Sequence, residues 1–199
     1  MTLHALALVV LMLCWAALAV MLVLARIRAR RGSTGEGATR KRDLQSWLGL
    51  ALQGVGFSLA WSLQRPPGSS FIPGGSSVIN GVLAVLAIAV AITSTAFAGA
   101  AIRTLDKQWS LTARVRGDHE LIRVGPFARV RHPIYSALLG LLIATALCLA
   151  HWWALPVAIV VYLLGTRWRT TREEHLLTEA FGAAYDDYRR QVPWLLPRV

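Results

Sequence analysis

The stretch GPFARVRHPIYSALLGLLIATALCL, residues 125–149, places two arginines and a histidine directly before an uninterrupted apolar run. The residue before a proline is pushed toward extended backbone, and proline is well accommodated as the first residue of a helix. We therefore expect a helix to begin at Pro133, with His132 as the last non-helical residue. Arg129, Arg131 and His132 then lie at the edge of an apolar layer, where charged groups are costly unless they bind something or reach water.

Four further apolar windows give the chain the pattern of a polytopic membrane protein. Of its 199 residues, 55% are hydrophobic, and a helix needs about 20 mainly apolar residues to cross a bilayer. The five windows are residues 3–25, 44–63, 78–102, 133–149 and 152–164. The sequence thus predicts an all-α membrane protein with about five transmembrane helices. Residues 1–102 hold helices one to three, and residues 103–199 hold the hairpin of helices four and five and a C-terminal helix.

The basic residues fall in blocks that alternate with the predicted spans. The net charge is +11, from 21 Lys and Arg against 10 Asp and Glu. All basic residues except Arg65 lie in residues 26–42, 103–131 and 167–198. With five spans these blocks face one side, which the positive-inside rule makes cytoplasmic. Since the Arg-, Ala- and Leu-rich composition is typical of bacteria, we expect a multi-pass protein of a bacterial inner membrane, with a cytoplasmic active site.

This placement also explains the charge without a nucleic-acid partner. Basic residues at the membrane surface follow the topology and attract anionic lipid headgroups. A nucleic-acid-binding protein would instead present its basic residues as a footprint for phosphates on one folded surface. We therefore expect membrane lipids, and no nucleic acid, among the partners.

The polar residues before Pro133 have two interpretations that residue chemistry alone does not separate. In the first, Arg129, Arg131 and the first turn of the helix form a donor-rich mouth that favours an anion. In the second, the two arginines extend to lipid phosphates and His132 only caps the helix.

A second polar cluster begins just past the fifth predicted span. Arg169 and Glu173 are four residues apart, which is the spacing of an ordinary helix-surface ion pair. Glu174 lies about 100° further around the helix. The alternative is a cofactor site, because a carboxylate binds a ribose diol well, and carboxylates and aromatic rings both attract a sulfonium cation.

Residues 167–190 are expected to form a helix that continues out of the fifth span. Phe181, Tyr185 and Tyr188 recur at the spacing of one helix face. Core packing is the plainer explanation for these rings, and stacking on an adenine is the sharper one. The sequence has no GxGxxG after a strand, no Walker A loop and no HExxH, so we expect neither a Rossmann-type domain nor a metal site.

Taken in order, these pieces resemble the isoprenylcysteine carboxyl methyltransferase-like family of integral-membrane methyltransferases, which is similar to the phospholipid N-methyltransferases. The family pattern is Gly-Pro-aromatic, Arg-His-Pro-x-Tyr, a helical hairpin, Glu-Glu, Phe-Gly-x-x-Tyr-x-x-Tyr and Val-Pro. Here it stands as Gly125-Pro126-Phe127, Arg131-His132-Pro133-Ile134-Tyr135, Glu173-Glu174, Phe181-Gly182, Tyr185, Tyr188 and Val192-Pro193, with Trp109-Ser110 before it. The resemblance covers roughly residues 105–197, about half of the chain.

The resemblance implies S-adenosyl-L-methionine as the methyl donor, bound between the two polar segments. The expected cofactor-binding residues are Gly125, Pro126, Phe127, Val130, Arg131, His132, Tyr135, Glu174 and Tyr185. Among them Glu174 is expected to hold the ribose. Arg169 and Glu173 are the expected catalytic residues, placed at the acceptor group, and the lipophilic acceptor would enter between the helices.

We favour a carboxylate as the acceptor, on an isoprenylcysteine or another lipid-linked acid, because an arginine fork suits a carboxylate. An ethanolamine phospholipid methylated on nitrogen is the alternative. Two other classes stay open: an NADPH-dependent membrane enzyme of the sterol-reductase type, and a non-enzymatic membrane scaffold. The expected partners are a lipophilic or prenylated substrate and membrane lipids, while the sequence leaves the oligomeric state unknown.

Overall fold

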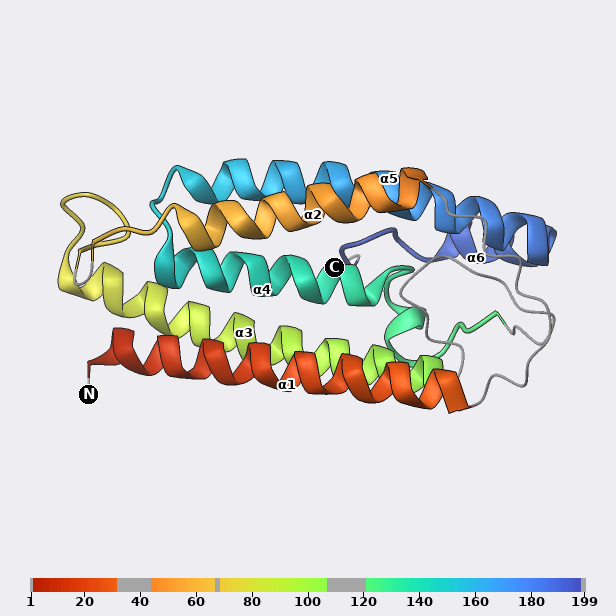
Figure 1. Cartoon of the computed structure of the whole chain (residues 1–199), viewed down its shortest axis with the longest axis horizontal. Coiled ribbons are helices and arrows are strands. Elements are labelled where there is room, and N and C mark those ends of the chain that lie inside the picture. Colours follow the sequence, from red (N-terminus) through yellow and green to blue (C-terminus); the bar gives the residue numbers. More distant parts are fainter. Residues whose placement is uncertain (1, 32–43, 67–68, 107–120, 198–199) are drawn as a thin grey trace.

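The computed structural model describes residues 2–31, 44–66, 69–106 and 121–197 (Figure 1). The helices of this part are α1 (Leu3–Arg31), α2 (Leu44–Ser62), α3 (Ser77–Leu105), the 3₁₀ helix η2 (Gly125–Ala128), α4 (Pro133–Leu149), α5 (Ala154–Phe181) and α6 (Ala183–Gln191). The described ranges contain no strand, only an isolated bridge between Gln64 and Ala150. The all-α prediction is confirmed for these ranges, whereas Trp109-Ser110 of the family pattern lies outside them.

The long helices form an elongated bundle in which α4 lies between two helix pairs (Figure 1). On one side α2 packs along α5, and on the other side α1 packs along α3. The ends of α1, α3 and α5, the start of α4, η2 and α6 all gather at one end of the bundle (right in Figure 1). We call this the site end, because it brings together both polar segments singled out in the sequence.

Within the described ranges, two helices are long and apolar enough to cross a membrane. They are Leu3–Ala29, with 27 residues, and Ser77–Leu105, with 29 residues. In the most apolar stretch of the first helix only 22% is buried inside the protein, and in that of the second only 28%. These two helices are therefore not the enclosed core helices of a soluble domain. Since large apolar side chains outside a bilayer are costly, this surface indicates a membrane protein. The 17-residue α4 is shorter, and the count of five spans stays a prediction.

Glycines bring α2 and α5 into backbone contact. A Cβ added to Gly165 would lie 2.7 Å from the carbonyl oxygen of Gly49 and 2.8 Å from the nitrogen of Gln53. The Gln53 side chain donates a hydrogen bond of 2.8 Å to the hydroxyl of Thr166. A Cβ on Gly49 would lie 2.5 Å from Cγ of Arg169. The close approach therefore sets where Arg169 lies against α2.

Arg65, the basic residue outside the three charged blocks, lies at the opposite end of the bundle. Its guanidinium donates hydrogen bonds to the carbonyl oxygens of Ala150 at 2.9 Å and Leu147 at 3.0 Å. It also lies 5.5 Å from the centre of the Phe71 ring. The last carbonyls of a helix lack partners within the helix, and a cation is favourable there. Arg65 therefore caps α4, which accounts for its exceptional position in the sequence.

Candidate functional site

The segment before α4 is anchored by the C-terminal part of the chain. The backbone nitrogen of Arg131 donates to the carbonyl oxygen of Pro193 at 2.9 Å, and that of His132 donates to Trp194 at 3.2 Å. Just before it, the Tyr188 hydroxyl donates to the carbonyl oxygen of Phe127 in η2 at 2.7 Å. These contacts hold η2 and the entry to α4 against α6 and the residues that follow it.

The side chain of His132 contacts two carboxylates and does not cap the helix that it precedes. As predicted, α4 begins at Pro133, and the His132 side chain makes no capping hydrogen bond. Its Nε2 instead lies 3.0 Å from Oε1 of Glu174, and its Nδ1 lies 3.7 Å from Oε2 of Glu173. The interpretation that His132 only caps the helix is therefore wrong, because the imidazole is buried between two carboxylates.

The two arginines before α4 have different environments. Arg129 is exposed to solvent, so an interaction with lipid phosphates fits it. Arg131 turns inward, and its Nη2 lies 3.2 Å from Oε1 of Glu174. Only 10% of the Arg131 side chain is exposed. The structure thus separates two residues that residue chemistry alone did not distinguish, and it places Arg131, which the family resemblance had singled out, in the polar cluster.

Glu174 is a buried carboxylate held in its charged form. Burial by itself would raise the pKa of this group, but the hydrogen bond with His132 and the positive charges of Arg131 and Arg167 outweigh it, so that the pKa of Glu174 is lowered. The side chain remains 9% exposed. It is therefore a preorganised anion with little competition from water, as a binding site for a polar ligand requires.

Tyr135 joins the second carboxylate to Arg169. The Tyr135 hydroxyl donates to Oε1 of Glu173 at 2.5 Å and accepts from Nε of Arg169 at 3.0 Å. Nη2 of Arg169 lies 3.6 Å from the same Glu173 oxygen. The predicted i, i+4 ion pair is confirmed. It is not an ordinary surface pair, because only 5% of the Arg169 side chain is exposed.

Tyr162 supports this triad from α5. Its hydroxyl donates to the backbone carbonyl oxygen of Tyr135 at 2.9 Å. Burial opposes the charge of Arg169, but Tyr135 and Glu173 more than compensate and raise the pKa of the guanidinium. Tyr162 was not predicted as a site residue, since nothing near it in the chain distinguishes it from an aromatic residue of an apolar span.

The predicted helix over residues 167–190 is interrupted. Gly182 has φ +52°, and it ends α5 and precedes α6. A positive φ at a helix end is the usual position of glycine, because other residues adopt it only with strain. Phe181 therefore belongs to α5, while Tyr185 and Tyr188 are buried on α6 with ring centres 6.0 Å apart. The prediction of one continuous aromatic face was wrong at this glycine.

Two buried polar atoms in the cluster have no hydrogen-bond partner among the described residues. They are Nε of Arg131 and the hydroxyl of Tyr185. Burial and the negative charge of Glu174 raise the pKa of Tyr185, which keeps its hydroxyl neutral. Leaving a buried donor unsatisfied costs about 1–3 kcal/mol, so both atoms are suited to a polar ligand beside Glu174.

The other predicted residues surround this cluster, and the C-terminal segment completes it. Gly125, Pro126 and Phe127 form η2, and Val130 is fully buried beside the entry to α4. Trp194 donates from Nε1 to the hydroxyl of Thr170 at 2.9 Å. Trp194 was not predicted as part of the site, although the Val-Pro pair just before it belongs to the family pattern.

The part of the chain that contributes most residues to this cluster is similar to known proteins. Residues 85–179 match the model described as the isoprenylcysteine carboxyl methyltransferase (ICMT) family. The chain is 38% identical over 86 residues to a protein-S-isoprenylcysteine O-methyltransferase of Mus musculus, covering 41% of this chain and 29% of that protein. It is 32% identical over 82 residues to the Schizosaccharomyces pombe protein of that name, and the match covers 41% of this chain and 35% of that protein.

A plant relative extends the match. Protein-S-isoprenylcysteine O-methyltransferase B of Arabidopsis thaliana is 31% identical over 102 residues, which are 50% of this chain and 51% of that protein. The matched regions thus span between about a third and a half of these three relatives. The family resemblance stated from the motifs is confirmed.

Proposed function

We propose that this chain, which is similar to the ICMT family over residues 85–179, transfers a methyl group from S-adenosyl-L-methionine to a carboxylate on a lipophilic acceptor. The observation that carries the proposal is the buried cluster in which His132, Glu174 and Arg131 adjoin Tyr135, Arg169 and Glu173. One half of the cluster has the chemistry for the donor and the other has the chemistry for the acceptor.

The donor half consists of Glu174, Arg131, His132 and Tyr185. When bound, S-adenosyl-L-methionine supplies an electrophilic methyl group on a sulfonium centre. The residues fit such a molecule: the charged carboxylate of Glu174 can accept hydrogen bonds from a ribose diol, and it attracts a cation. The unpartnered Nε of Arg131 and the Tyr185 hydroxyl offer donors to polar groups of the same ligand. η2, fixed by Tyr188, would cover it.

The acceptor half consists of Arg169, Glu173 and Tyr135. A carboxylate acceptor already carries its negative charge, so the chain does not need a strong base. Its residues have to align the acceptor and exclude water. The guanidinium of Arg169 is suited to hold a carboxylate, and Tyr135 and Glu173 fix its orientation. All three residues lie on helices, which position side chains more accurately than loops do.

The location of the cluster supports a lipophilic acceptor. It lies at the site end of a bundle whose outer helices are apolar, so a polar donor and the head of a membrane-embedded acceptor can meet there. The three basic blocks favour the cytoplasmic side of a bacterial inner membrane. The names of the relatives make an isoprenylcysteine carboxylate the first acceptor class to test.

The donor half is tested by the binding of S-adenosylhomocysteine to detergent-purified protein. We expect a rise in melting temperature for the wild type, and none for Glu174→Gln. Glu179→Gln is the matched control, since Glu179 lies on the same helix with its side chain 61% exposed, and it should respond as the wild type does. If the wild type shows neither binding nor a thermal shift, the proposal fails.

The acceptor is tested separately with radiolabelled methyl donor and a farnesylcysteine analogue. A carboxyl methyl ester releases its label in base, whereas an N-methyl group does not. We expect base-labile product, and its loss in Arg169→Gln. Base-stable label on ethanolamine phospholipid would instead establish the amine as the acceptor and overturn the carboxylate.

A further inference from the structure

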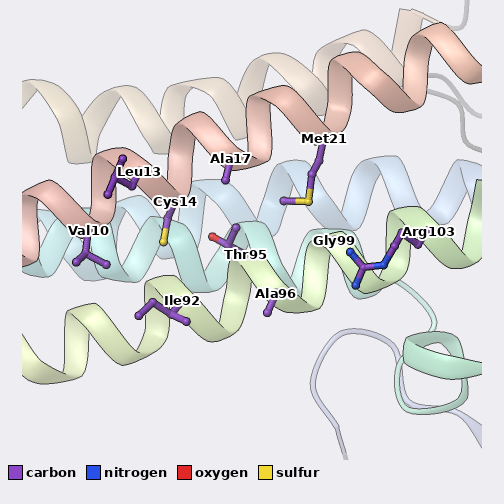
Figure 2. Close-up of a pocket in the computed structure, with 10 residues that line it drawn as sticks. All are labelled: Val10, Leu13, Cys14, Ala17, Met21, Ile92, Thr95, Ala96, Gly99 and Arg103. Carbon is purple, nitrogen blue, oxygen red and sulfur yellow. The ribbon is translucent and has the colours of Figure 1, made fainter.

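A groove between α1 and α3 lies outside the polar cluster and has a different chemistry. Figure 2 shows its lining, with Val10, Leu13 and Met21 projecting from α1 toward Ile92 and Ala96 of α3. The groove has a volume of about 520 Å³, which is in the range of small-molecule sites. Since α4 lies between this helix pair and α5 (Figure 1), the groove is separate from Arg169 and Glu173.

The groove has a polar end and an apolar end. Arg103 lies at the site end, where its Nη1 would be 3.3 Å from a Cβ added to Gly99 on the same helix. Figure 2 shows the guanidinium turned back beside Gly99, along the groove. No acidic residue is among those that line the groove. The hydroxyl of Thr95 is already bonded to the carbonyl oxygen of Ala91 at 2.8 Å, so Arg103 dominates the polar character of the lining.

The length of the groove matches one leaflet of a bilayer. Its lining extends from Val10 to Met21 on α1 and from Ile92 to Arg103 on α3, which is about 16 Å along each helix. The hydrocarbon layer of one leaflet is about 15 Å thick. A single lipid chain placed between these helices would thus reach from the membrane surface, at Arg103, to the bilayer centre, at Val10 and Ile92.

We propose that this groove binds one anionic phospholipid of the leaflet at the site end, with an acyl chain between α1 and α3 and its phosphate on Arg103. An arginine fork binds phosphate with charge-assisted hydrogen bonds, and the rest of the lining is suited to a hydrocarbon chain.

The site is connected to the polar cluster through the residue after Arg103. Thr104 is the nearest neighbour of Gly125 at the start of η2: a Cβ on Gly125 would lie 3.2 Å from the Thr104 hydroxyl oxygen. A lipid held on Arg103 therefore stabilises the end of the helix on which η2 rests. The lipid binds whether or not the protein transfers methyl groups, so its test does not depend on the proposed function.

The test is native mass spectrometry of the full chain released from detergent with equal amounts of phosphatidylglycerol and phosphatidylcholine. We expect one bound phosphatidylglycerol on the wild type, and a preference over phosphatidylcholine that falls about fivefold in Arg103→Gln. Arg103→Lys keeps the charge and should keep most of the preference. Arg28→Gln is the matched control, since Arg28 is a neighbouring exposed arginine outside the groove lining, and it should bind as the wild type does.

A second variant tests the apolar part of the groove. Ala96→Leu fills it from α3, and should reduce the binding of both lipids while the melting temperature shows that the protein is folded. The proposal is overturned if Arg103→Gln and Arg28→Gln weaken the preference equally, which would mean general surface attraction. It is also overturned if the wild type carries no lipid, or if Ala96→Leu dissociates a dimer, which would make a second copy the occupant.

Discussion

Tyr135 and Arg169 are joined by a hydrogen bond of 3.0 Å from the arginine Nε to the phenol oxygen, across 34 positions of the sequence. Tyr135 belongs to the first turn of α4, and Arg169 lies far along α5. Because the same hydroxyl donates to Glu173, one phenol orients both members of the ion pair. The first turn of α4 thus determines the geometry of the Arg169–Glu173 pair.

Tyr135→Phe removes this hydroxyl and keeps the ring. We expect kcat for methyl transfer to fall by about 10–100-fold, since a hydrogen bond to a charged group contributes about 1.5–3 kcal/mol. The dissociation constant of S-adenosylhomocysteine should change by less than about threefold. Steady-state kinetics and calorimetry measure the two quantities, and an unchanged kcat would show that the phenol does not orient Arg169 for the reaction.

Tyr188→Phe tests the donor half with the same chemical change. It removes the 2.7 Å hydrogen bond to the carbonyl oxygen of Phe127 and releases η2 from α6. We expect the affinity for S-adenosylhomocysteine to fall by about fivefold, the factor for a typical net hydrogen bond of about 1 kcal/mol, with little change in kcat at saturating donor. The reverse pattern, with affinity intact and kcat reduced, would contradict the assignment of η2 to the donor.

Glu174→Gln should change how stability depends on pH. The pKa of Glu174 is lower in the folded protein than its ordinary value of 4.5. Its ionic contacts therefore stabilise the fold above pH 4.5, and this contribution is lost as pH falls through the lowered pKa. We expect the variant to melt below the wild type at neutral pH, with the difference shrinking in acid. A difference independent of pH would exclude the charge of Glu174 as its cause.

Gly49→Ala should separate α2 from α5. The new Cβ would lie 2.5 Å from Cγ of Arg169 and 2.9 Å from the carbonyl oxygen of Gly165. We therefore expect overpacking to lower the free energy of unfolding by about 1–3 kcal/mol and to reduce methyl transfer. Gly54→Ala on the same helix is the control, because no atom lies within 4 Å of its Cβ position. The free energy of unfolding of this control should rise by up to about 1 kcal/mol, because alanine has the higher helix propensity. Equal melting temperatures for the two variants would argue against the close packing of α2 on α5.

Arg65→Met should weaken the end of α4 that lies away from the site. The carbonyl oxygens of Leu147 and Ala150 lose their charged donor, and an unsatisfied buried acceptor costs about 1–3 kcal/mol. Arg190→Met, at a side chain that is 71% exposed, should change the melting temperature little. If both variants melt alike in detergent, Arg65 does not act as a cap.

The sequence predicted those parts of the site that follow from local backbone rules. Pro133 as the start of α4 follows from the restriction that proline places on His132, and the Arg169–Glu173 pair follows from helical spacing. The meeting of His132 with Glu174 was expected from the order of the family motifs, since a hairpin of helices returns the chain to its starting side.

Other features depend on contacts between distant parts of the chain. Arg169 is buried because Gly49 lets α2 approach it, and neither residue indicates this by itself. The break at Gly182 was missed because aromatic spacing was followed across a glycine that α5 uses as its end. The different environments of Arg129 and Arg131 follow from Pro193, whose carbonyl oxygen fixes the backbone of Arg131, and no pattern near Arg131 predicts that contact.

The anchoring of the entry to α4 by the C-terminal segment has a consequence for synthesis of the protein. Ser136 donates to the carbonyl oxygen of Leu195, which lies 59 positions later, so α4 is synthesised well before its first turn has its final partners. At about 5–20 residues per second, the ribosome makes that stretch in roughly 3–12 s. During this interval His132 and Arg131 lack the backbone contacts that hold them in the cluster. The polar cluster can therefore form only after residues 193–195 have been synthesised.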